Sequence, residues 1–192
     1  MGGCFSEDVG GCVGKRLVLR GFPRINYRVN MKYKVVELDA GEMAVVTMLA
    51  AMRHSCNRKH NVSNSRIGPQ SDHITDLDGL IAEFAFCKWK NIYPDLTINP
   101  RSGGSDCVIN KKRVDIKTTR YKQGRLLATI SKKPTDVDVY ILSIIEDNKV
   151  TFVGWAMSDE LLQQSNIVDL GHGKSYALAQ SQLRQFNFSQ GD

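Results

Sequence analysis

Residues 103–119 read GGSDCVINKKRVDIKTT, and the predicted fold follows mainly from this segment. The two glycines at its start predict a turn, and two short runs with β-forming residues follow, 106–109 and 113–119. Asn110-Lys111 joins the two runs. The stretch is therefore predicted to form a β-hairpin.

The second strand of this hairpin places a charged pair among apolar neighbours. Strand side chains alternate between the two faces of a sheet, so Asp115 and Lys117 are expected on one face. Val114 and Ile116 are then expected to point the other way, into the core. A carboxylate and an ammonium group on a central strand are costly to bury unless they serve a ligand or each other.

The sequence on either side of the hairpin predicts an α/β fold. The apolar spacing predicts a strand at 33–38, a helix at 41–58 and a second helix at about 77–89, capped by Asp76 or Asp78. After the hairpin it predicts strands at 126–130, 137–145 and 149–155, a short helix at 158–163, and a small strand and a helical turn within 175–186. The polar stretch 61–75 predicts a loop.

Length and composition favour one globular domain of 192 residues, with 42% hydrophobic and 24% charged residues. The predicted domain covers residues 31–192, with a core at about 76–160. Residues 1–30 are glycine-rich and basic without periodicity, so they are predicted to be a poorly ordered leader or a basic arm. The chain lacks a run of about 18 apolar residues, so no membrane association is expected.

The charge and the cysteines point to a setting and a class of partner. The formal net charge of +6 favours a polyanionic partner such as nucleic acid. The odd count of five cysteines predicts a reducing, cytoplasmic environment. His54, Cys56 and His60 carry zinc-binding side chains, but without a CxxC pair they are more simply interpreted as polar residues at a helix end.

Asp106, Asp115 and Lys117 suit the hydrolysis of a phosphodiester bond. That reaction needs an acidified water, neutralised negative charge and a stabilised leaving oxygen, and one or two Mg²⁺ ions supply all three. Mg²⁺ prefers oxygen ligands and keeps several waters, so a few converging carboxylates are enough. A lysine can then orient the water or offset charge. Mg²⁺ is therefore the expected ion, with Mn²⁺ as the expected substitute.

The order of these residues resembles the PD-(D/E)xK nuclease superfamily, including its members in phages and prokaryotes. The resemblance covers about residues 76–160 and rests on Glu83 in the predicted helix, on Gly103-Gly104-Ser105-Asp106, and on Val114-Asp115-Ile116-Lys117. Gly79–Glu83, Val153-Gly154-Trp155 and Ser158–Leu161 are also similar. Ser105 replaces the proline before the first aspartate, and the triplet uses Asp rather than Glu.

The resemblance implies a restriction-endonuclease-like mixed central sheet flanked by helices. It also implies that Asp106, Asp115 and Glu83 bind the metal and that Ile116 contributes its main-chain carbonyl. Lys117 would assist the attacking water. The activity implied is that of an endodeoxyribonuclease, and by analogy the enzyme could be a homodimer.

Basic residues bracket this predicted centre along the sequence, where phosphate contacts would be useful. The expected DNA contacts are Lys111, Lys112, Arg113, Arg120, Lys122, Arg125, Lys132 and Lys133. Three alternatives stay open: an ordinary ion pair between Asp115 and Lys117 with a solvated basic face, an inactive nucleic-acid-binding module on the same fold, and a structural interaction protein.

Overall fold

The computed structural model describes residues 33–62, 71–100, 104–171 and 173–186. The chain divides into two units, Met1–Asn30 and Met31–Asp192, and every described residue belongs to the second unit. The prediction for residues 1–30 therefore lies outside the described residues. No helix in the described part of the chain is long and apolar enough to cross a membrane.

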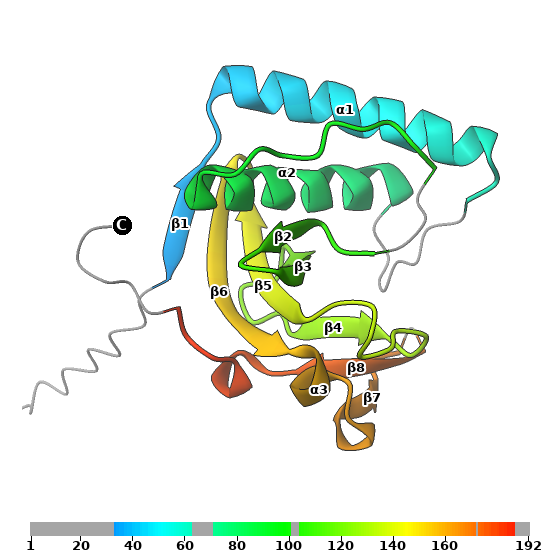
Figure 1. Cartoon of the computed structure of the whole chain (residues 1–192), viewed down its shortest axis with the longest axis vertical. Helices are drawn as coiled ribbons and strands as arrows, with labels where there is room; N and C mark the ends of the chain where they lie inside the picture. Colours follow the sequence, from blue (N-terminus) through cyan, green and yellow to red (C-terminus); the bar gives the residue numbers. More distant parts are fainter. Residues whose placement is uncertain (1–32, 63–70, 101–103, 172, 187–192) are drawn as a thin grey trace, which may run out of the picture. The chain divides into compact units, whose positions relative to one another are not determined.

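The central element of the second unit is a five-stranded mixed sheet in the order β1-β6-β5-β3-β2 (Figure 1). Only β3 and β5 run parallel, and the other neighbours are antiparallel. The strands are β1 (Lys34–Glu37), β2 (Cys107–Ile109), β3 (Lys112–Thr119), β5 (Val139–Glu146) and β6 (Lys149–Met157). These bounds confirm the predicted hairpin of β2 and β3 and the α/β class.

The long helix α2 (Asp72–Lys90) packs against one face of this sheet, and α1 (Ala40–Lys59) packs against α2 on the side away from the strands (Figure 1). A capping box begins α1: the Asp39 side chain accepts a hydrogen bond from the Glu42 N–H, and the Glu42 side chain accepts one from the Asp39 N–H. The predicted start of α2 is wrong, because Ser71 caps it and 72–75 are helical rather than loop. Asp76 and Asp78 instead pair with other side chains within the helix-sheet assembly.

A second, three-stranded antiparallel sheet lies on the other face, in the order β4-β8-β7. Its strands are β4 (Leu126–Thr129), β7 (Ile167–Asp169) and β8 (Lys174–Leu178), and the short helix α3 (Ser158–Leu161) lies beside them (Figure 1). Two single turns of 3₁₀ helix, Gln164–Asn166 and Gln180–Gln182, complete the described elements. The sequence predicted β4 and β8 but missed β7, which is only three residues long.

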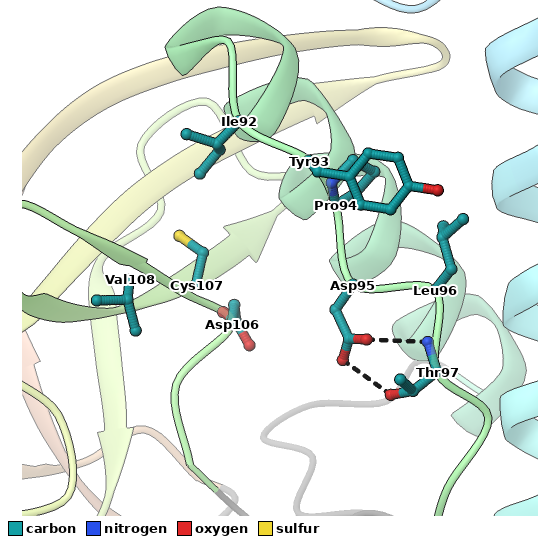
Figure 2. A pocket seen from close by; sticks show the side chains of 9 residues that line it. All are labelled: Ile92, Tyr93, Pro94, Asp95, Leu96, Thr97, Asp106, Cys107 and Val108. Carbon is teal, nitrogen blue, oxygen red and sulfur yellow. Dashed lines mark hydrogen bonds between the residues drawn. The ribbon is translucent and has the colours of Figure 1, made fainter.

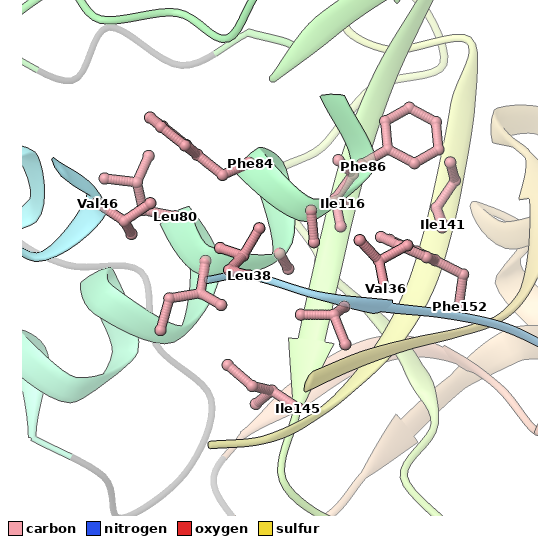
Figure 3. Close-up of a cluster of buried hydrophobic side chains, with 14 of the residues drawn as sticks. Val36, Leu38, Val46, Leu80, Phe84, Phe86, Ile116, Ile141, Ile145 and Phe152 are labelled. Atoms are coloured by element: carbon pink, nitrogen blue, oxygen red, sulfur yellow. The ribbon is translucent and has the colours of Figure 1, made fainter. Parts of the chain in front are cut away.

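Two apolar clusters hold these layers together, one on each face of the central sheet. Val114 and Ile116 are buried in the cluster beneath α1 and α2, as the alternation of β3 predicted (Figure 3). Tyr140 and Leu142 of β5 belong to the cluster on the other face. The central strands are thus packed on both faces by apolar side chains, so the charged side chains of β3 have closely packed neighbours.

Candidate functional site

The candidate site lies where β3 loses one of its two neighbours. β2 pairs only with Lys112–Val114, so from Asp115 onward β3 has a described neighbouring strand on the β5 side alone. Asp106 directly precedes β2, and its Oδ2 accepts a 2.6 Å hydrogen bond from the main-chain N–H of Ile116. The N–H and C=O of a strand residue point to the same side, so the Ile116 carbonyl also faces this open edge.

Asp115 is the most deeply buried carboxylate at this edge, with 3% of its surface exposed. Lys117 Nζ lies 2.7 Å from its Oδ1, and Lys132 Nζ lies 3.3 Å from its Oδ2. Each carboxylate oxygen of Asp115 is therefore held by a separate ammonium group. The sequence predicted that Lys117 shares a face with Asp115 and left their ion pair as an alternative, whereas it assigned Lys132 only to DNA.

Glu83 reaches the site from α2. Its Oε2 lies 3.7 Å from the guanidinium of Arg53 on α1. Arg53 also donates to the carbonyl oxygens of Thr97 (3.0 Å) and Asp95 (2.8 Å), so it fixes the chain segment that follows α2. Sequence reasoning missed Arg53, because it lies in a separate helix with nothing in its local pattern to connect it to the hairpin.

The electrostatics show that the carboxylates act on one another. Burial, and then the negative charge of Asp106, raise the pKa of Glu83 well above its usual value. Burial and the charge of Asp115 raise the pKa of Asp106 to about 7. Burial alone would lower the pKa of Lys117, but Asp115 and Asp106 outweigh it, so the pKa lies above its usual value. Added positive charge near Asp106 and Glu83 would therefore be favourable.

The donor atoms fit a hard cation in kind but not in their present arrangement. The carboxylates of Glu83, Asp106 and Asp115 and the carbonyl of Ile116 offer oxygen ligands, which Mg²⁺ prefers. Yet no group of three His, Cys, Asp or Glu side chains in the described part of the chain could hold a metal ion. Both Asp115 oxygens are already taken by ammonium groups. A cation at Asp115 would therefore share a carboxylate oxygen with an ammonium group or displace it.

A solvent-open groove of about 600 Å³ leads to Asp106. Residues 92–97 form one wall and residues 106–108 form the other (Figure 2). Asp95 in the first wall is held by hydrogen bonds from the N–H and hydroxyl of Thr97. Because Arg53 also holds this wall, the groove and Glu83 are fixed by one side chain.

Three of the eight basic residues expected to contact DNA are paired with carboxylates. Arg120 makes two hydrogen bonds, of 2.6 and 2.7 Å, to the buried Asp78. Arg113 pairs with Asp138 at 3.1 Å, and Lys132 contacts Asp115. The other five are exposed and make no ion pair with a described residue: Lys111, Lys112, Lys122, Arg125 and Lys133.

Tyr140 is a further polar group beside the site that the sequence did not reveal. It is the register partner of Asp115 in the parallel pairing of β3 and β5. Its hydroxyl is fully buried and makes no hydrogen bond with the described residues. Burial and the charge of Asp115 raise its pKa, so it remains a neutral donor. The surroundings of Asp115 therefore contain one donor that is not in use.

The three residues considered for zinc lie near the C-terminal end of α1, away from any shared partner. His54 Nδ1 is 3.0 Å from Asp76 Oδ2 on α2. Cys56 Sγ is 3.8 Å from His60 Nδ1, one helical turn away. Cys56 and His60 thus contact each other while His54 pairs with α2, and no metal-binding group of three such side chains is found in the described part of the chain, in line with the simpler interpretation of a polar helix end.

Comparison of the chain with protein-family models, with curated proteins and with solved structures finds no match. The fold and the site together define a mixed α/β protein with a cluster of buried and partly buried carboxylates and ammonium groups at the open edge of a central strand.

Proposed function

We propose that this protein is a metal-dependent nuclease that hydrolyses phosphodiester bonds of DNA, on a restriction-endonuclease-like fold. The observation that carries the proposal is the mutual electrostatic influence of Glu83, Asp106, Asp115 and Lys117 at the open edge of β3. The two carboxylates with raised pKa values lie where a cation would lower the energy of both.

Each residue has a distinct role in the proposed reaction. A bound Mg²⁺ or Mn²⁺ would make a water more acidic and neutralise charge on the phosphate. Asp106, Asp115 and Glu83 supply carboxylate oxygens to hold the ion, and Ile116 supplies its carbonyl. Lys117 orients the attacking water and offsets the negative charge that develops on the phosphate.

The groove and the exposed basic residues suit the remaining parts of a DNA substrate. The groove opens beside Asp106, so a strand lying along it would bring a phosphate to the carboxylates. The five exposed lysines and arginines near β3 and β4 would contact phosphates further along the backbone. A homodimer, which would place two such centres on the two strands of a duplex, and a cytoplasmic setting are further parts of this proposal.

A cleavage assay with matched variants tests the proposal. Purified full-length protein is incubated with Mg²⁺ or Mn²⁺ and a panel of linear, nicked, single-stranded and branched DNA. We expect cleavage by the wild type and loss of at least about 100-fold in rate for Asp115→Asn and Asp106→Asn. Asp159→Asn, an exposed carboxylate on α3, serves as a control that keeps activity. Absence of metal-dependent cleavage on every substrate would refute the proposal.

A second candidate is an inactive nucleic-acid-binding module on the same fold. The occupied oxygens of Asp115 favour it, because two ammonium groups already satisfy this carboxylate without a metal. This function predicts salt-dependent DNA binding that is the same with EDTA and with Mg²⁺. It also predicts that Asp106→Asn leaves DNA affinity unchanged, whereas the nuclease requires metal-dependent cleavage that this variant lacks.

A further inference from the structure

Lys132 occupies a position that the nuclease proposal does not explain. Its ammonium lies 3.3 Å from Asp115 Oδ2, although Lys117 already compensates the same carboxylate at 2.7 Å. A single buried carboxylate needs one cation for charge balance, whereas Asp106 accepts a 2.6 Å hydrogen bond from the Ile116 N–H and makes no ion pair with a described residue. The second ammonium therefore lies on a carboxylate that Lys117 already compensates.

The backbone around Lys132 is fixed while its side chain is long. The N–H of Lys132 donates to the Thr129 carbonyl at 3.1 Å, and the N–H of Lys133 donates to Asp136 Oδ2 at 2.9 Å. The Lys132 side chain is 22% exposed, so its ammonium has a route to solvent. The flexible four-carbon side chain of Lys132 allows its ammonium to move while the backbone of the turn stays in place.

Lys117 and Lys132 differ in how readily they can leave Asp115. Lys117 stands two residues away on the same strand, and its charge is also favoured by Asp106 and Glu83. Lys132 comes from another segment and makes the longer contact. Tyr140, the register partner of Asp115 on β5, has a buried hydroxyl without a hydrogen-bond partner among the described residues.

We infer that Lys132 is a positioning residue that holds Asp115 Oδ2 until a divalent cation takes this oxygen, and that its released ammonium then neutralises a phosphate of the DNA. The inference rests on the proposed nuclease function. Metal and Lys132 compete for one oxygen, so removal of the Lys132 charge should strengthen metal binding and weaken substrate binding. A lysine that merely stabilises the fold would not produce these two opposite effects.

Metal binding without DNA gives the first readout. The dissociation constant for Mn²⁺ is measured by calorimetry on full-length wild type, Lys132→Met, Lys132→Gln and Lys132→Arg. We expect Mn²⁺ to bind about fivefold more tightly or better to the Met and Gln variants, and at wild-type strength to the Arg variant. Lys133→Met, an exposed neighbour without an ion pair in the described part, is the matched control. The Gln variant keeps the test usable if Met prevents folding.

Substrate binding gives the second readout. In steady-state cleavage with Mn²⁺, log(kcat/KM) falls with log[salt], and Lys132→Met should reduce this slope by about one phosphate contact. Unchanged or weaker Mn²⁺ binding in Lys132→Met, in a wild-type protein that binds Mn²⁺ and cuts DNA, overturns the inference and leaves the nuclease proposal intact. If the wild type neither binds Mn²⁺ nor cuts DNA, the nuclease proposal and the inference about Lys132 are both refuted.

Discussion

Two sets of ionic contacts flank β3, and they differ in how their carboxylates are paired with cations. The Asp78–Arg120 pair joins α2 to the end of β3 with one carboxylate and one guanidinium, and both carboxylate oxygens accept a hydrogen bond. The open-edge cluster, which consists of Glu83, Asp106, Asp115, Lys117 and Lys132, places two ammonium groups on one carboxylate and leaves two other carboxylates with raised pKa values.

The difference separates a fully paired contact from a cluster whose charges are unevenly paired. In the bidentate pair, the buried carboxylate of Asp78 has both oxygens satisfied, so removal of its partner costs stability. The open-edge cluster satisfies Asp115 twice and Asp106 with one main-chain N–H, so its electrostatic energy can still fall when a cation arrives. Three measurements test this contrast.

The largest effect is expected for Lys117→Met, which removes the charge but keeps most of the side-chain length. We expect the cleavage rate to fall by roughly 10²- to 10⁴-fold, because the attacking water loses its orienting group. Unfolding free energy should change little, since Lys132 still compensates Asp115. Single-turnover cleavage and urea unfolding measure the two quantities. A large loss of stability with normal cleavage would place Lys117 with the structural pairs instead.

The next effect is expected for Arg120→Ala, which leaves the buried Asp78 without its partner. We expect a loss of about 2–3 kcal/mol in unfolding free energy, less than for a fully buried pair because Arg120 is half exposed. Urea denaturation measures the loss, and Lys122→Ala is the exposed control with little expected change. Cleavage at a temperature where the variant is folded should stay within a few-fold of wild type. A variant of normal stability would show that this pair does not hold the fold.

The smallest effect is expected in the pH dependence of the metal-free protein. Asp106 has a pKa of about 7 in the folded chain and about 4 when unfolded, so between these values the folded state binds the extra proton. Stability should therefore decrease as pH rises from 5 to 8, by about 1–2 kcal/mol, because solvent screening at this partly exposed carboxylate reduces the full effect of the pKa difference. Urea unfolding in EDTA at several pH values measures this decrease. Asp106→Asn should show a smaller decrease, and an unchanged decrease in this variant would contradict the assignment.

Much of the fold could be predicted because its signals are local. The hairpin of β2 and β3, the strands β5 and β6 and most of α1 follow from side-chain periodicity over a few residues. The start of α2 could not be found this way, since its first turn is mostly polar and Asp72 in it pairs with Arg58 on α1. Ser71 was the available sign, because serine is a favoured N-cap and its hydroxyl accepts from the N–H of Ile74.

The candidate site was predictable only where the chain is locally regular. The alternation of β3 indicated that Asp115 and Lys117 share a face, and the turn before β2 indicated Asp106. Arg53 and the Asp115 contact of Lys132 depend on how distant segments pack, which no local pattern encodes. The three paired basic residues make the same point, because a charged stretch in sequence does not show which charges find partners within the fold.

The parallel pairing of β3 with β5 also affects the order in which contacts form during folding. Parallel neighbours cannot be joined by a tight turn, so the chain leaves the central sheet after Thr119 and returns at Val139. β4 and the turn with Lys132 lie on this detour, and β4 pairs with β8, about fifty residues further along the chain. Such distant contacts form late because of their loop-closure entropy. We therefore expect a nascent chain to assemble Asp106, Asp115 and Lys117 early, with the arrival of Lys132 among the last steps of maturation.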